Sequence, residues 1–398
     1  MNDVSRAAET AVRDSYGKLL AYLSCRTHDI ALAEDALSDA FAKALSKWTE
    51  DGVPKNPDAW LLTVARNRLT DRQRHLTKFP TESEVPDIEA PDTSRDPFKD
   101  KRLALLMVCA HPAIAPDLHT PLMLQTVLGI EAKTIAQLFL MSPAALSKRL
   151  VRAKAKIRDA GIPFQIPDKE QLPERSTAIL EAIYALHAHD WLDPTDGMGE
   201  EALYLANLLT QLLPENAEVF GLCALIAFSH ARRKARIIDG ALVPIEQQDM
   251  SLWDDQLIAY GNRQLHHAYE MKSIGRFQVE ASIETVHLSR KKTGNIDWQA
   301  LNQLYHAYLK QAPSAGAKVS QAVVTAHLHG NKAGLQALIN LENQIGSAFQ
   351  PLWAARAELH SRIGDRQEAR LCYDKAISLT TDIPVLKFLR QKSSLLGQ

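Results

Sequence analysis

The sequence has few of the features that mark secreted, membrane or metal-binding proteins. Its 398 residues contain four scattered cysteines, and none of them forms a CxxC pair. This argues against a zinc site or a disulfide framework and fits a reducing cytoplasm. No run approaches the roughly 18 consecutive apolar residues of a membrane helix. The N-terminus, MNDVSRAAETAVRD, also lacks the apolar core of a signal peptide. We expect a cytoplasmic protein without membrane association.

Motifs of the common enzyme classes are missing as well. The chain contains no GxGxxG, P-loop, HExxH or GxSxG sequence. Two HxH pairs occur, at His187/His189 and His327/His329, but residues i and i+2 of a helix point in different directions and suit a metal poorly. We therefore expect no enzymatic activity, no catalytic residue, no cofactor and no metal site.

What the sequence does contain is helical periodicity along nearly its whole length, with apolar residues three and four positions apart. Residues 29–48 carry such an apolar stripe, and Asp29 is placed to cap the helix. Glu34, Asp35 and Asp39 lie off that stripe. A second helix is predicted to start at Asn56-Pro57.

This second helix has a polar face that includes Arg66, Asn67, Thr70 and Arg74. Such a face suits nucleic acid about as well as it suits solvent. Trp60 offers two readings: it stacks on an unpaired base, or, as we favour, it packs in the core beside neighbouring apolar residues.

Residues 80–97 form a break, with four prolines and six acids against one arginine. This composition predicts an extended linker between domains.

A concentrated basic helix follows at residues 143–158. Between Met141 and Arg158 the chain carries six Lys or Arg and no acid, whereas its total formal charge is only −1. Ser142 and Pro143 suit a helix start, and a preceding helix and short turn complete a helix-turn-helix arrangement. The apolar residues and most of the basic residues take opposite faces. A solvated basic surface is the plainer alternative, but one-sided charge on a helix-turn-helix favours DNA.

The C-terminal part has an internal period of 34 residues, seen in the spacing of Gly330 and Gly364. This is the tetratricopeptide period, and Trp353, Ala369 and Tyr373 fall at its signature positions. We expect a tetratricopeptide-like helical array.

Three separate stretches, AEDALSDAFAKAL, NPDAWLLTVARNRLTDRQR and TIAQLFLMSPAALSKRLVRAKAKIR, resemble bacterial sigma factors of the extracytoplasmic-function group. CAHPAIAP, LPER and the helical tail resemble its subgroup with a long C-terminal extension. The resemblance implies an all-α fold with four sections: sigma region 2 (1–78), an acidic linker (79–98), the helix-turn-helix region 4 (99–162) and a tetratricopeptide-like regulatory domain (171–398).

The resemblance also implies the partners, core RNA polymerase and promoter DNA, together with a protein partner or ligand of the C-terminal domain. It assigns polymerase binding to Glu34, Asp35 and Asp39, and capture of the −10 promoter element to the polar face defined above. It assigns reading of the −35 element to Ser142, Lys148, Arg149, Arg152 and Lys156.

The function expected is thus promoter-specific initiation of transcription under the control of the C-terminal domain. An ordinary helix-turn-helix regulator with a ligand- or partner-sensing helical domain is the alternative. It would bind duplex DNA without polymerase and would not need the two helices at residues 29–76.

Overall fold

The computed structural model describes residues 3–76, 101–139, 141–168, 170–192 and 198–396. The chain forms two compact units, Met1–Leu186 and His187–Gln398. The division falls inside one helix, α8 (Leu172–Leu192). The acidic linker expected at 79–98 lies outside the described residues.

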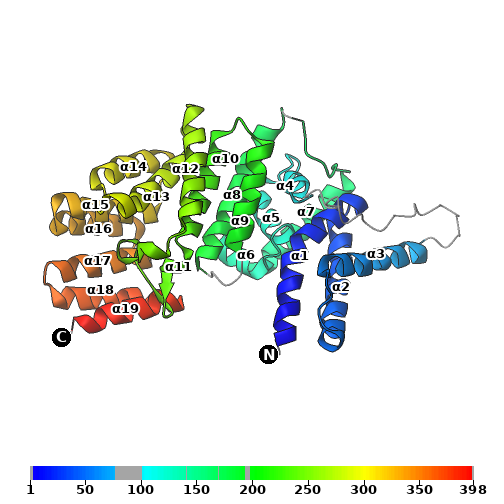
Figure 1. Cartoon of the computed structure of the whole chain (residues 1–398), viewed down its shortest axis with the longest axis horizontal. Helices are drawn as coiled ribbons and strands as arrows, with labels where there is room; N and C mark the ends of the chain where they lie inside the picture. Colours follow the sequence, from blue (N-terminus) through cyan, green and yellow to red (C-terminus); the bar gives the residue numbers. More distant parts are fainter. Residues whose placement is uncertain (1–2, 77–100, 140, 169, 193–197, 397–398) are drawn as a thin grey trace. The chain divides into compact units, whose positions relative to one another are not determined.

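The first unit is built from helices alone in its described part, as expected (Figure 1). In chain order they are α1 (Asp3–Thr27), α2 (Ile30–Asp51), α3 (Pro57–Leu76), α4 (Arg102–Cys109), α5 (Pro116–Thr126), α6 (Ala132–Leu138), α7 (Pro143–Asp159) and the first part of α8.

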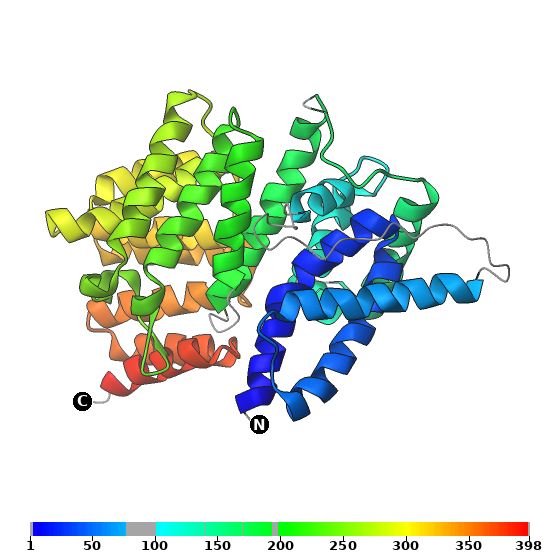
Figure 2. The same cartoon turned by 45° about the vertical axis from the view of Figure 1, so that its right-hand side comes forward.

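Helices α1, α2 and α3 share one hydrophobic core and are the three blue helices of Figure 2. Both predicted helix starts are confirmed: Asp29 Oδ1 accepts a hydrogen bond from Leu32 N at 3.1 Å, and Asn56 Oδ1 accepts one from Ala59 N at 3.0 Å. Side chains of this kind satisfy backbone N–H groups that have no partner within the helix. The apolar stripe of α2 is buried apart from Phe41, which is half-buried against the same core.

The second unit begins with α9 (Met198–Leu212), α10 (Ala217–Ala231) and α11 (Arg233–Arg236). A small hairpin follows, in which β1 (Ile237–Ile238) pairs antiparallel with β2 (Ala241–Leu242). The rest of this unit comprises the short 3-10 helices η2 (Ile245–Gln247) and η3 (Met250–Leu252), then α12 (Asp255–Glu270), α13 (Arg276–Thr293), α14 (Trp298–Gln311), α15 (Ala315–His329), α16 (Asn331–Ile345), α17 (Gln350–Arg362), α18 (Arg366–Ser378) and α19 (Ile383–Leu395).

Helices α13 to α19 pack in succession, each against its neighbour along the chain (Figure 1). Gly330 and Gly364 occupy the turns after α15 and α17 with φ of 92° and 82°, a backbone conformation that favours glycine. Ala369 and Tyr373 are almost fully buried, at 0% and 2% exposure. The 34-residue period therefore marks helix pairs that bury their apolar faces against one another, as in helical repeat proteins. None of the described helices has the length and apolar character needed to cross a bilayer.

Candidate polymerase- and DNA-binding surfaces

The acidic residues expected to contact polymerase lie on α2, and two of them face α3. Asp35 Oδ2 is 3.2 Å from Arg72 Nη1, and Asp39 Oδ2 is 2.5 Å from Arg68 Nε. The Asp35 and Asp39 side chains remain 69% and 47% exposed. Exposed pairs of this kind contribute about 0–1 kcal/mol. Both carboxylates therefore remain accessible to a partner with a basic surface.

Glu34, the third acid expected to contact polymerase, does not share this outward surface. Its Oε1 and Oε2 atoms lie 2.6 and 2.7 Å from Nζ of Lys154 on α7. The side chains are only 22% and 7% exposed for Glu34 and Lys154. Burial raises the pKa of Glu34, and the ammonium of Lys154 opposes that rise. Adjacent residues of a helix point about 100° apart, so Glu34 turns away from Asp35.

Lys154 is a residue that the sequence reasoning missed. It stands four positions after Leu150 and three before Ile157, which places it on the apolar stripe of α7. A charged residue on a buried stripe requires a partner. The position of Lys154 on the apolar stripe therefore indicates that it needs an acidic partner. It does not indicate which acid that partner is.

The other basic residues of α7 divide between solvent and nearby acids. Leu146, Leu150, Ala153 and Ile157 are buried, as predicted, and Lys148, Arg152 and Lys156 are exposed on the other side. Arg149 is half-buried and donates a hydrogen bond to Asp117 of α5.

Ser142 holds the N-cap position of α7 in an extended conformation, φ −68° and ψ 127°. Its side chain makes no capping hydrogen bond within the described part of the chain. The side chain is exposed at the start of the basic helix, where helix-turn-helix proteins contact DNA.

The residues expected to contact the −10 element differ in accessibility. Asn67 is exposed. Thr70 is half-buried and donates from Oγ1 to Arg66 O at 3.0 Å. Arg66 is half-buried, donates to the Tyr22 hydroxyl and has its guanidinium carbon 5.2 Å from the centre of that ring. The Arg74 side chain lies outside the described residues.

Trp60 packs edge-on against Trp48, with ring centres 5.4 Å apart. Trp60 is half-buried against the core of α1, α2 and α3. The core reading of this residue is therefore confirmed.

Two segments of the chain match known families. Residues 11–79, which cover most of α1, α2 and α3, match Sigma-70 region 2. Residues 175–269 match a family of unknown function, DUF6596.

Two relatives show how far the similarity extends. An uncharacterized protein of Rhizobium meliloti (strain 1021) is 31% identical over 405 residues, which is 98% of this chain and 95% of that protein. A probable RNA polymerase sigma factor, RfaY, of Xanthomonas campestris pv. campestris is 30% identical over 142 residues. The match covers 33% of this chain and 35% of the Xanthomonas protein. With region 2 at its N-terminus and an extension that the Rhizobium protein shares almost end to end, the chain belongs to the sigma-70 family of RNA polymerase sigma factors.

Proposed function

We propose that this protein directs core RNA polymerase to specific promoters, and that its C-terminal helical unit controls this step. The observation that carries the proposal is the combination, in one chain, of a Sigma-70 region 2 segment and the one-sided basic helix α7. Its work is recognition rather than bond chemistry. Helix α2 docks on polymerase, α3 captures the −10 element and α7 reads the −35 element.

The contacts of α7 support DNA recognition. Lys148, Arg152 and Lys156 present their charges to solvent, while an apolar back fixes the helix on the domain. Arginine can grip guanine with two hydrogen bonds, whereas lysine mostly holds phosphate. We therefore assign base reading to Arg149 and Arg152, and backbone contact to Lys148 and Lys156. To contact a base, the Arg149 guanidinium must break its hydrogen bond to Asp117.

The Glu34–Lys154 pair implies an opening step. It joins α2 to α7, two helices with different partners, polymerase for α2 and upstream DNA for α7. While the pair is closed, the Glu34 carboxylate is unavailable to polymerase. Binding of polymerase would therefore separate α2 from α7 and free both residues.

The second unit has the size and the surface of a regulatory domain. Its roughly 200 residues exceed what promoter recognition requires, and stacked helix pairs present long surfaces for partners. We infer that this unit adjusts the activity of the sigma domains. Transcription with and without this unit decides whether it inhibits or assists the sigma domains.

Helix α8 decides where the two parts can be separated. Arg175 is 6% exposed and donates from Nη1 to the carbonyl oxygen of Met107, at 2.9 Å, near the end of α4. A cut at residue 171, where the sequence suggested a boundary, would leave this carbonyl without its partner. The cut therefore belongs after Leu192.

Run-off transcription with core polymerase over a promoter library tests the main proposal. We expect selective initiation that depends on the added protein. Selective binding of promoter duplex by the protein alone, with no effect on transcription, would instead support the helix-turn-helix regulator.

The control exerted by the second unit is tested by comparing the full chain, residues 1–192, and residues 1–192 with residues 198–398 added. Circular dichroism must first show that both pieces are helical. We expect the three preparations to differ in promoter-dependent transcription. Equal activity in all three would remove the regulatory role and leave the sigma function intact.

A further inference from the structure

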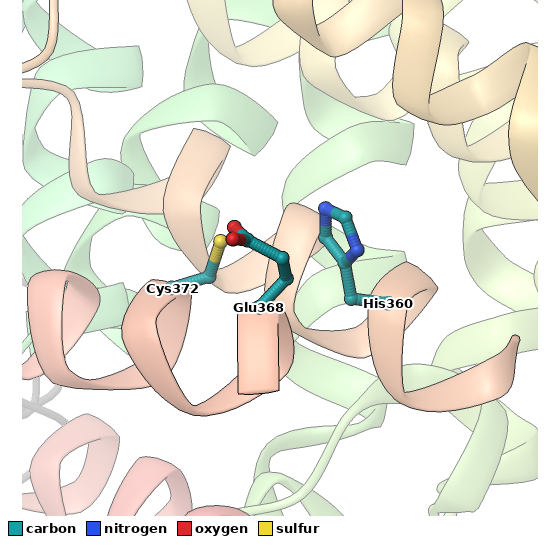
Figure 3. A group of neighbouring side chains, drawn as sticks. All are labelled: His360, Glu368 and Cys372. Atoms are coloured by element: carbon teal, nitrogen blue, oxygen red, sulfur yellow. The ribbon is translucent and has the colours of Figure 1, made fainter. Parts of the chain in front are cut away.

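A cluster of metal-ligating side chains lies in the second unit, at the corner between α17 and α18. His360 stands in the last turn of α17, and Glu368 and Cys372 stand one turn apart on α18. Their ligand atoms all lie within 4.8 Å of one another. Figure 3 shows the Glu368 carboxylate beside the Cys372 sulfur, with one nitrogen of the His360 ring directed toward them. Two helices thus supply a nitrogen, a sulfur and a carboxylate oxygen to one point.

These three ligand types together favour zinc. Zinc accepts thiolate, imidazole and carboxylate ligands at about 2.0–2.3 Å, which in a tetrahedron places ligand atoms roughly 3.3–3.8 Å apart. Closing the cluster onto an ion requires only a small movement. Glu368 is exposed and can make that movement, whereas Cys372 is 1% exposed and fixed in the core.

Asp365 lies beside His360 and also holds the start of α18. Its Oδ1 caps α18 by accepting from Glu368 N at 3.2 Å. Its Oδ2 lies 3.3 Å from the buried Nδ1 of His360, which has no well-aligned hydrogen bond among the described side chains. A carboxylate beside one ring nitrogen is the usual companion of a metal-bound histidine, because it orients the ring and leaves the other nitrogen for the ion.

The charges around the cluster favour a cation. Glu368 and Asp365 contribute two carboxylates, and the guanidinium of Arg356, which acts on Cys372, is held by Glu342 at 2.6 Å. Burial raises the pKa of the Cys372 thiol, and Arg356 partly offsets that rise.

We propose that His360, Glu368 and Cys372 bind one zinc ion, with water as the fourth ligand and Asp365 orienting the histidine. The ion would join α17 to α18 and make the stability of this helix pair depend on metal supply. The proposal does not rest on promoter recognition.

The experiment uses the tag-free full chain, stripped of metal with a chelator and titrated with Co²⁺ as a spectroscopic substitute for zinc. We expect one equivalent to bind, with a near-ultraviolet thiolate-to-cobalt charge-transfer band and visible bands of a four-coordinate ion. Zinc should remove these bands by displacement. Cys372→Ser should abolish the charge-transfer band, while Cys25→Ser, which changes a half-exposed thiol of the first unit, should retain it.

Two further variants guard against effects of misfolding. Glu368→Gln changes an exposed side chain, and Asp365→Asn keeps a good N-cap residue while removing the charge. We expect Asp365→Asn to weaken binding about 10- to 100-fold. Zinc should raise the Tm of the wild type and not that of Glu368→Gln. Absence of the charge-transfer band in the wild type, its persistence in Cys372→Ser, or an equal Tm rise in Glu368→Gln would each overturn the proposal.

Discussion

Lys154 Nζ lies 2.6 Å from Glu34 Oε1, although 120 residues separate the two in the chain. This pair joins the basic helix α7 to α2, which lies in the Sigma-70 region 2 segment. Both groups are largely withdrawn from water, so each depends on the other for its charge to be compensated.

Removing either partner should destabilise the first unit. For Glu34→Ala or Lys154→Ala we expect a loss of about 2–3 kcal/mol in the free energy of unfolding, because a largely buried charge is left unpaired. Replacing both, as Glu34→Gln with Lys154→Met, should cost less than either alanine variant. Urea unfolding measures these differences. If the loss in the Glu34→Gln/Lys154→Met variant equals the sum of the losses from Glu34→Gln alone and Lys154→Met alone, the pairing is contradicted.

The same pair should limit how fast polymerase binds. Lys154→Met loosens the contact while leaving the Glu34 carboxylate in place, so we expect faster association with core polymerase. Glu34→Gln also weakens the contact but removes a carboxylate that we propose to contact polymerase, and it should not bind faster. Stopped-flow or surface-based association rates separate the two. Slower association of Lys154→Met would argue against an opening step.

Reversal of the exposed acids of α2 should weaken polymerase binding without unfolding the protein. We expect Asp35→Lys with Asp39→Lys to reduce affinity for core enzyme, because a basic partner surface would be repelled. Arg68→Ala with Arg72→Ala is the matched control, since it removes the same intramolecular pairs and keeps the acids. Retention of the folded Lys variant on core enzyme, at the wild-type level, would exclude these carboxylates as docking groups.

Substitutions on α7 should distinguish base reading from phosphate contact. Arg149→Ala and Arg152→Ala should each cost about 1–3 kcal/mol at the preferred promoter and relax the preference at one base. Lys148→Ala and Lys156→Ala should weaken all sequences alike and reduce the salt dependence. Transcription over a promoter library measures both effects. Unchanged selectivity in the arginine variants would remove the −35 assignment.

The pH dependence of the second unit should include Glu358. Burial tends to raise the pKa of this carboxyl, but Lys392 at 3.4 Å and Arg362 at 3.1 Å prevail, and its pKa is lowered. A lowered pKa in the folded state stabilises the protein above the unfolded pKa, about 4.3, and this stabilisation is lost as the pH falls through the folded value. The Tm difference between wild type and Glu358→Gln should therefore shrink below about pH 4.3. The exposed Glu215→Gln is the control, and a constant difference down to pH 3 would contradict the assignment.

The sequence by itself determined the local structure of this protein. The apolar stripes of α2 and α7 and the caps at Asp29 and Asn56 agree with the structure, and the 34-residue spacing of Gly330 and Gly364 coincides with turns between helices. These features depend on residues within about four positions of one another along a helix, or on the backbone of a single residue. Such local interactions can therefore be predicted from the order of the residues.

Only the tertiary structure decided which distant groups meet. Arg66 belongs to the predicted polar face of α3, yet it is held by Tyr22 of α1. Glu34 points away from Asp35 and Asp39 and pairs with Lys154 on α7. His360, Glu368 and Cys372 fit no sequence motif for a metal site, and they converge because the α17–α18 turn brings two helix faces together. A residue's spacing along the chain gives its direction on its own helix. Which distant residue it contacts depends on how whole helices pack against one another. Hydrophobic burial fixes that packing through many weak contacts, and the polar groups then pair with the groups that lie opposite them.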